Sequence, residues 1–379
     1  MYYFDHSATT PVHPEVSELM DHIQSTTYGN PSSMYSAGQK AKGIIEKSRR
    51  QVAESISAEP EQIIFTSGGT ESNNQVIWYI LQNQKKHVVS NLIEHPAIIN
   101  VLEFLKPFGL SHTLVETNNN GIISIENIMD AINPQTSLVS LMLANNEIGS
   151  IQPVKSIVDM VHDQNIIVHT DAVQCMGKME INIADMGVDF LSLSAHKFYG
   201  PKGIGVLYVR KPKNISSLIV GGGQEMGLRA GTENVASIAG MGLAAELAAS
   251  STKSHINSLK KFENQFKSGL KTFFPDAIYN GDQTIKLPGL VNVSFPNFRS
   301  DILMAKLDRL NIAVSNGSAC GSGNIKPSPI LTAIGVDEVM NLSTLRFSFG
   351  SSNTPDHIDY LLAQLKSILV KVSSKVLSK

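Results

Sequence analysis

The sequence predicts an α/β fold in which a large domain with a mostly parallel central sheet is joined to a smaller α+β domain. From about residue 15 to residue 250, apolar strand-like runs alternate with runs of helical periodicity, which is typical of a parallel sheet covered by helices. At 379 residues the chain is too long for one compact core. We therefore expect a large domain at residues 14–252 and a small domain formed by residues 1–13 and 253–379.

The expected strands of the large domain are apolar runs at residues 62–65, 87–90, 137–143, 166–169, 190–192 and 205–209. Helical periodicity marks residues 36–57 and 154–165, and a helix rich in small residues follows at about 235–250. Glycines at 221–223 and 227–231 mark a long loop, which we interpret as functional. From residue 255 we expect a helix, strand 290–295, helix 301–310, a loop with a cysteine, a helix, strand 344–349 and a terminal helix.

Composition and charge exclude several classes of function. The net charge of −2 offers no basic surface for nucleic acid. We find no apolar run of membrane-spanning length and no signal peptide at the N-terminus, so we expect a cytoplasmic protein without a membrane partner. The two cysteines lack the spacing of metal ligands, so no metal site is expected. Cys175 follows an apolar strand and is expected to be a small core residue.

The most informative segment is SLSAHKFYGPKG, at residues 192–203, between two expected strands. A lysine amine at such a place can form a Schiff base with a carbonyl if its surroundings favour the free amine. Lys197 is the better candidate, because Lys202 lies in a turn that water can reach. Ser194 and His196 are positioned to donate hydrogen bonds to a phosphate. The alternative is that both lysines are simply exposed in a turn.

Two further strand ends carry residues that suit a phosphate and a ring nitrogen. Residues 63–72 read as a strand, a glycine turn and a helix start, where Gly69 and Thr70 form a candidate phosphate site. Such turns are common in α/β proteins. Asp171 ends an apolar strand, where it is either a helix N-cap or a buried carboxylate paired with a protonated pyridine nitrogen. Gln174, three residues later, is placed to donate to a ring oxygen.

Three further positions are less specific by themselves. His95 lies at a strand–helix junction, where a histidine is more often structural than catalytic. Asn146 follows another strand, where it is either part of a site or simply stabilises a turn. Cys320 lies in a loop of small residues, outside the apolar surroundings that a structural cysteine would have, so we expect a chemical role for its thiol, with an incidental exposed thiol as the alternative.

These motifs together resemble one family. The segments FDHSATTP, SGGTESNN, EHPAIIN, NNEIG, HTDAVQ, SLSAHKFYGPKG, GLRAGTEN and SNGSACGSG follow the order and spacing found in the cysteine desulfurases of iron–sulfur cluster assembly. These belong to the class V aminotransferase group of enzymes that depend on pyridoxal 5′-phosphate (PLP), with fold type I. The similarity extends over nearly the whole chain, and the motifs are specific as a set although each one alone is weak.

The resemblance implies a role for each of these positions. Lys197 would hold PLP covalently, Asp171 would pair with its ring nitrogen, and Gln174 would contact its ring hydroxyl. His95 would stack on the ring and move protons. The phosphate would be bound by Gly69, Thr70, Ser194 and His196, with Thr232 reaching the phosphate of the partner subunit in a homodimer. Asn146 would lie beside the cofactor and, with Arg346, would hold the substrate carboxylate.

The implied reaction removes sulfur from L-cysteine, gives L-alanine and leaves a persulfide on Cys320 for an acceptor protein such as an iron–sulfur scaffold. The sequence departs from the family pattern at Gly321, where threonine is expected, and at Lys326, where glutamate is common. The C-terminal tail that docks a scaffold is expected to be short or absent. The alternatives are a selenocysteine lyase, another class V PLP aminotransferase, or a regulatory partner without catalysis, which the intact set of Lys197, Asp171, His95 and Cys320 argues against.

Overall fold

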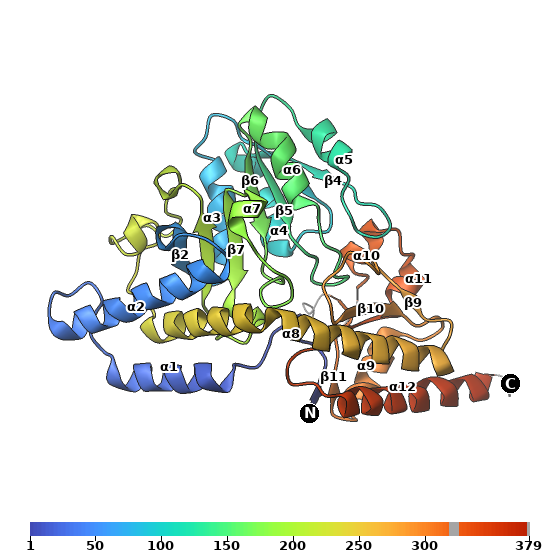
Figure 1. The fold of residues 1–379 in the computed structure, drawn as a ribbon. Helices are drawn as coiled ribbons and strands as arrows, with labels where there is room; N and C mark the ends of the chain where they lie inside the picture. The colour runs from blue at the N-terminus through green and yellow to red at the C-terminus, as the bar shows by residue number, and fades with distance from the viewer. Residues whose placement is uncertain (318–325, 377–379) are drawn as a thin grey trace.

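A seven-stranded sheet forms the centre of the larger part of the molecule (Figure 1). The computed structural model describes residues 1–317 and 326–376. The strand order is β2-β8-β7-β6-β5-β3-β4, and only β8 runs antiparallel to its neighbours. The strands are β2 (Ile63–Thr66), β3 (His87–Asn91), β4 (Ser111–Val115), β5 (Thr136–Met142), β6 (Ile167–Asp171), β7 (Phe190–Ser194) and β8 (Gly205–Val209).

Helices cover both faces of this sheet, because alternate residues of each strand point to opposite sides. Ile64 belongs to an apolar cluster with helices α3 (Gly69–Ile80) and α4 (Pro96–Leu105). Its neighbour Ile63 belongs to the cluster on the other face. That face is covered by helices α2 (Ser36–Ser55), α5 (Ile125–Ala131), α6 (Val154–Val161), α7 (Ile183–Met186) and the first half of α8 (Val235–Phe273). Helix α1 (Pro14–Thr26) packs on α8.

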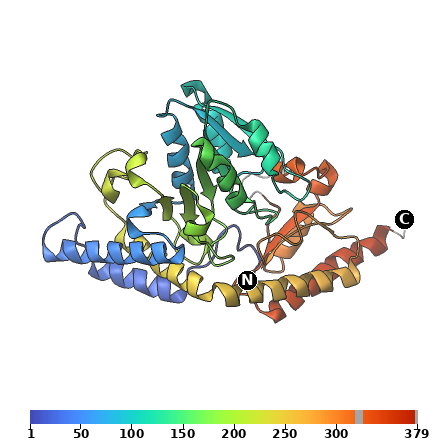
Figure 2. The ribbon, with the colours of Figure 1, turned by 45° about the horizontal axis from the view of Figure 1, so that its top comes forward.

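A separate apolar cluster forms the core of the smaller part, to the right in Figure 1. It joins Phe4 to the second half of α8, to an antiparallel sheet and to the last helix. The elements here are β1 (Tyr2–Tyr3), β9 (Ile278–Tyr279), β10 (Leu290–Ser294), α9 (Ser300–Asp308), β11 (Ile312–Ala313), α10 (Pro329–Ala333), α11 (Glu338–Asn341), β12 (Thr344–Ser348) and α12 (Pro355–Val376). Figure 2 shows α8 running along the base of both parts.

The predicted fold class is confirmed, with differences in single elements. Residues 235–273 form one helix, where a break near residue 250 was expected. The hydroxyls of Ser251 and Thr252 donate to the carbonyls of Leu247 and Ala248, so these polar residues stay inside the helix. Strand β4 was not expected from the sequence. The domain boundary at 252/253, which falls within this helix, stays a prediction.

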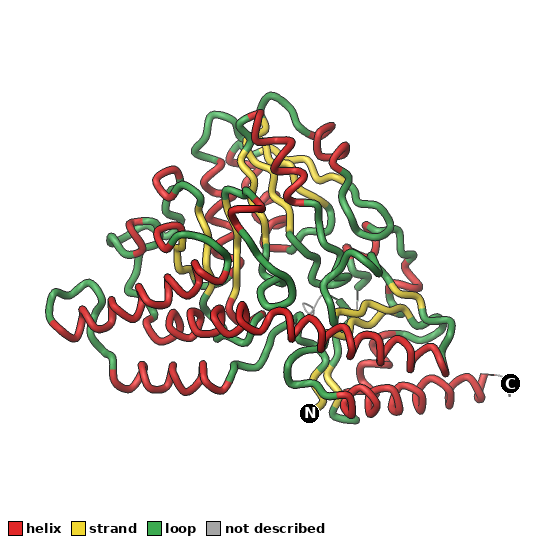
Figure 3. Tube along the Cα trace, in the orientation of Figure 1, coloured by secondary structure: helices red, strands yellow, loops and turns green. Residues whose placement is uncertain are grey.

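Helix α8 is, by length and composition alone, apolar enough to cross a membrane, which the sequence alone did not suggest. However, 56% of its most apolar 18-residue stretch is buried inside the molecule. Its small residues, among them Gly240 and Gly242, lie against α1 and α2, where a side chain would collide with Met20 and Ser48. Figure 3 shows the same helix beneath the strands of the central sheet. Its apolar composition therefore fits a core helix.

Candidate active site

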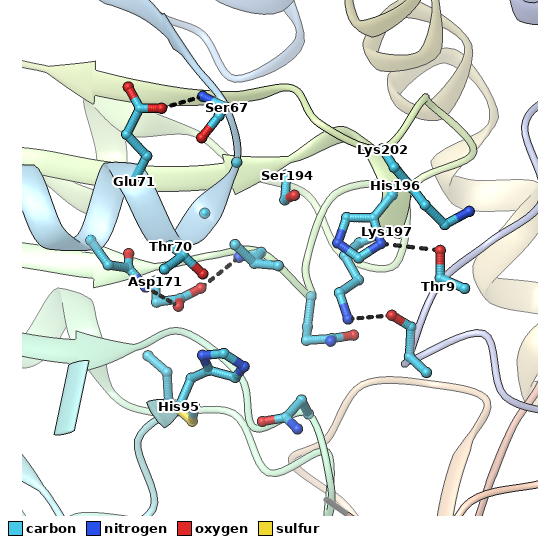
Figure 4. A pocket seen from close by; sticks show the side chains of 18 of the residues that line it. Thr9, Ser67, Thr70, Glu71, His95, Asp171, Ser194, His196, Lys197 and Lys202 are labelled. Atoms are coloured by element: carbon cyan, nitrogen blue, oxygen red, sulfur yellow. Dashed lines mark hydrogen bonds between the residues drawn. The ribbon is translucent and has the colours of Figure 1, made fainter. Parts of the chain in front are cut away.

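One cavity of about 570 Å³ brings most of the predicted residues together (Figure 4). It lies at the carboxyl ends of β5, β6 and β7 and at the starts of α3 and α4, the usual place for ligands in such sheets. Nine predicted residues line it: Gly69, Thr70, His95, Asn146, Asp171, Gln174, Ser194, His196 and Lys197.

Lys197 ends the short 3-10 turn η4 (Ala195–Lys197), which follows β7. Its Nζ donates to the carbonyl oxygens of Ser7 at 2.6 Å and Ala8 at 2.8 Å. Burial lowers the pKa of Lys197 from 10.5 to about 7, and the positive charges of Arg346 and Lys178 act in the same direction. A large share of this amine is therefore neutral, hence nucleophilic, near pH 7. Lys202 also lines the cavity, but it is exposed as expected.

Asp171 ends β6 with its carboxylate directed into the cavity wall. Its Oδ2 accepts from Asn73 Nδ2 at 2.7 Å, and its Oδ1 accepts from the amide of Val173 at 3.0 Å. The helix N-cap alternative is wrong, because turns follow Asp171 and the next helix begins at Ile183. Asn73 was not singled out from the sequence. Asn73 lies one helical turn after Gly69, on the helix beside β6, and this position is the sequence signal that could have identified it.

The glycine turn between β2 and α3 presents a free helix N-terminus to the cavity. No side chain in the part of the chain that the structure describes caps α3, whose first residue is Gly69, so its first backbone N–H groups are available to an anion. A side chain at Gly205 would meet the backbone of Gly68 at 2.5 Å, so only glycine allows β8 to lie this close. Ser194, His196 and Lys202 line the same part of the cavity.

A second set of contacts holds this turn in place. Glu71 accepts from the amide of Ser67 at 2.7 Å and pairs with Arg229 at 3.0 Å.

His196 contacts Thr9 Oγ1 through Nδ1 at 3.1 Å. Burial, together with the charges of Lys197 and Lys202, lowers the pKa of His196 to about 4. This ring is therefore neutral at pH 7 in the ligand-free protein.

His95 caps α4 and borders the cavity on the side opposite Ser194 (Figure 4). Its Nδ1 accepts from the amide of Ala97 at 3.1 Å, so a neutral ring carries its proton on Nε2. Desolvation by the surrounding protein atoms lowers the pKa of His95, although its side chain is accessible from the cavity. The preceding residue, Glu94, is buried, and burial raises its pKa to about 8.

Asn146 and Arg346 are neighbours, but only Asn146 reaches the cavity. The Arg346 guanidinium donates through Nη1 to the Asn146 carbonyl oxygen at 2.9 Å and through Nη2 to Asp5 at 2.7 Å. Its Nε and the Asn146 Oδ1 atom are buried and have no hydrogen-bond partner within residues 1–317 and 326–376. Asp5 lies in the segment FDHSATTP, but it was assigned no role from the sequence. Its partner is 341 positions away, so no local sequence pattern indicates the contact.

Of the remaining predicted residues that the structure describes, Gln174 lies in the cavity and the others do not. Thr232 is exposed on the long loop before α8 and does not line the cavity. Cys320 lies outside the described residues. Cys175 is fully buried in the large apolar cluster, as expected, and burial raises the pKa of its thiol. Gln174 lines the cavity and donates to the Ser7 carbonyl oxygen at 3.0 Å.

The cavity fits PLP at three points. An uncapped helix N-terminus in a cavity that Lys202 also lines suits a phosphate, a carboxylate held by two donors suits a protonated ring nitrogen, and the Lys197 amine suits an aldehyde. In Figure 4, Asp171 and Lys197 approach this space from opposite sides. The fold and the residues that line this cavity thus fit an α/β enzyme that holds PLP on a lysine.

Comparison with known proteins gives the family. The pattern named "Aminotransferase class-V" matches residues 2–361. "Cysteine desulfurase IscS" of Clostridium botulinum is 42% identical over 372 residues, which cover 97% of this chain and 94% of that protein. The protein of the same name from Methanosarcina thermophila is 40% identical over 98% of this chain and 92% of its own length. The chain belongs to the class V aminotransferase family, within its cysteine desulfurase group.

Solved structures agree with this assignment. A protein named "NIFS-LIKE PROTEIN" superposes with a TM-score of 0.91 at 36% identity, covering 97% of this chain and 99% of that one. "SspA in complex with cysteine" superposes with a TM-score of 0.82 at 35% identity over 93% of this chain and 99% of that one. The family resemblance and the fold predicted from the sequence are both confirmed.

Proposed function

We propose that this protein uses PLP to remove sulfur from L-cysteine, releases L-alanine and carries the sulfur as a persulfide on Cys320. The observation that carries the cofactor assignment is Lys197, an amine with its pKa lowered to about 7, in the same cavity as a held carboxylate and an uncapped helix N-terminus. When bound, PLP supplies an aldehyde that condenses with amines and a ring that accepts the electron pair left by a departing α-proton.

The residues of the chain then have separate tasks. Lys197 would hold the cofactor and, once displaced by the substrate amine, would take up the α-proton through Nζ. Asp171 would keep the ring nitrogen protonated, and the hydrogen bonds from Asn73 and Val173 fix its two oxygens for this purpose. The helix start at Gly69, with Ser194 and His196 nearby, would bind the phosphate.

His95 is suited to donating a proton. With Nδ1 occupied by the Ala97 amide, its Nε2 holds the proton of the neutral ring. The Arg346 guanidinium already donates one hydrogen bond from each Nη group, to the Asn146 carbonyl oxygen and to Asp5, so only part of its five N–H donors is left for the expected carboxylate contact. Because Asn146 lines the cavity and Arg346 does not, we propose that the substrate carboxylate meets Asn146 first and then the remaining N–H donors of Arg346.

The sulfur transfer itself balances without a further reactant. The Cys320 thiolate would attack the sulfur of the bound substrate, so that an S–S bond forms while the C–S bond breaks. The carbon keeps the bonding electron pair and gains a proton, which yields L-alanine. The persulfide sulfur is then available to an acceptor protein, for which we propose an iron–sulfur scaffold because several relatives carry the name IscS.

We further propose that the protein is a homodimer and that Thr232 contacts the partner's phosphate. Exposed apolar side chains gather at the end of the molecule that carries the long loop, to the left in Figure 1. Tyr28 and Met34 are 91% and 95% exposed between α1 and α2, and Val220 is 86% exposed on the loop. Pro31 and Gly223 line one pocket, so the two segments adjoin.

The free, buried Cys175 fits a reducing compartment, so cytoplasm is the proposed location.

A pair of lysine variants tests the cofactor site. Lys197→Ala should abolish the absorbance of covalently held PLP, and borohydride should no longer attach the cofactor to the protein. Lys202→Ala is the matched control, because this lysine lines the same cavity but is exposed. It should keep both signals. Covalent PLP in Lys197→Ala, or its loss only in Lys202→Ala, would show that the assignment is wrong.

A further inference from the structure

We propose that a second cavity, separate from the proposed PLP cavity, binds a small organic carboxylate with an apolar body. This cavity of about 440 Å³ lies between α8 and the segments 176–178, 197–199 and 351–353. Lys197 lines both cavities, so its side chain stands in the wall between them. None of the roles proposed above uses the second cavity.

Lys178 supplies a buried positive charge to this cavity. Only 7% of the residue is exposed, and its Nζ makes a single long hydrogen bond, 3.4 Å to Gln174 Oε1. Burial lowers the pKa of Lys178 to about 8, so the amine is still mostly charged at neutral pH. Charge interactions link Lys178 to Cys175, Arg346, Lys197, His6 and His255, and no carboxylate is among these described residues. A buried ammonium group normally has an anionic partner, and none is supplied here by the described chain.

Two histidine nitrogens lack partners beside it. His255 Nε2 and His13 Nδ1 are buried without a hydrogen bond among the described residues, and both histidines line the cavity. The His255 ring packs edge-on against Tyr199 with centroids 6.0 Å apart, which fixes its orientation. Unsatisfied buried polar atoms are uncommon in proteins and often mark a bound ion, water or ligand. Lys178, whose charge acts on His255, and the unpartnered His255 Nε2 together form a polar part of the wall that suits an anion.

The rest of the lining selects the body of the ligand. Apolar side chains form much of the wall, namely Met176, Phe198, Ala244, Leu247, Ala248 and Phe262. The α8 serines that border the cavity offer few donors, because Ser251, Ser254 and Ser258 each donate to a carbonyl oxygen of the same helix. Among the described residues no aspartate or glutamate lines the cavity, so the ammonium group of an amino acid would find no charged partner there. A simple carboxylate therefore fits better than cysteine or alanine.

Propionate is the probe, and its uncharged isostere propionamide is the matched control ligand. Calorimetry on the purified protein with its cofactor should show saturable propionate binding in the millimolar range and none for propionamide. Lys178→Met keeps the length of the side chain but removes the charge, and should weaken propionate binding about tenfold or more. Ser254→Leu fills the cavity from α8, away from Gln174, and should weaken it as well.

Lys253→Met is the control variant, because Lys253 is exposed on the same helix and does not line the cavity. It should bind propionate as the unmodified protein does. Equal binding to all variants, or displacement of propionate by L-alanine, would place the anion at the reaction site and overturn the proposal, as would the absence of saturable binding. If Lys178→Met fails to fold, Ser254→Leu against Lys253→Met decides the question.

Discussion

Replacing Lys197 by methionine should stabilise the cofactor-free protein at pH 7 and destabilise it at high pH. Burial lowers the pKa of this amine from 10.5 to about 7. Each pKa unit corresponds to about 1.4 kcal/mol, so keeping Lys197 in the folded protein costs at most about 4 kcal/mol at pH 7. Methionine has no charge to bury and keeps most of the apolar stem.

The variant also loses two hydrogen bonds, from Nζ to the carbonyl oxygens of Ser7 and Ala8. At about 1 kcal/mol each, their loss offsets roughly half of the gain. The net gain at pH 7 is therefore about 2 kcal/mol. Since the folded pKa lies below the unfolded one, the cost of Lys197 disappears as the pH rises from about 7 to 10.5. Above that range only the lost hydrogen bonds remain, so the variant becomes the less stable protein.

Urea unfolding of cofactor-free Lys197→Met and wild type at a series of pH values measures this difference. The difference in free energy of unfolding should change sign near the middle of the pH range. Lys202→Met serves as the control, because an exposed lysine should change stability by less than about 0.5 kcal/mol at any pH. A difference that does not vary with pH, or a Lys197→Met variant less stable than wild type at pH 7, would refute the burial argument.

Three further substitutions test other parts of the account. Asp171→Asn should still bind PLP, but turnover should fall strongly because the ring nitrogen loses its anionic partner; near-normal alanine release would rule out that role. Glu225→Gln should lower the free energy of unfolding by about 3 kcal/mol, because it weakens the bidentate pair with buried Arg49, and an unchanged urea midpoint would contradict this. Gly205→Ala should weaken PLP affinity, since its methyl group would meet Gly68 at 2.5 Å, and unaltered PLP titration would show that the turn does not depend on this close approach.

The sequence predicted those parts of the site that are local to one strand end. Lys197, Asp171 and the glycine turn each follow an apolar run, and the carboxyl ends of parallel strands meet at one edge of the sheet, so their convergence followed from the fold class. The local sequence around each motif was enough because the chemical groups directly follow the strand.

The parts that were missed depend on contacts between distant segments. Asp5 holds Arg346 across 341 positions, and the carbonyl oxygens of Ser7 and Ala8 receive the Lys197 amine across about 190 positions. Nothing in the local pattern indicates such pairs. Lys178 was not singled out from the sequence, although it is buried and lines a cavity beside α8. The extent of α8 was missed for a related reason, since tertiary packing and serine back-bonding overrode weak helix propensity.

The position of the sulfur after reaction with L-cysteine tests the central claim most directly. The protein should be mixed with one equivalent of L-cysteine, trapped with an alkylating reagent, digested and examined by mass spectrometry. The account predicts one added sulfur atom on the peptide with Cys320, released alanine in equal amount, and loss of both in Cys320→Ser but not in Cys175→Ser, because Cys175 is fully buried. Sulfur on Cys175, or undiminished alanine release by Cys320→Ser, would contradict it.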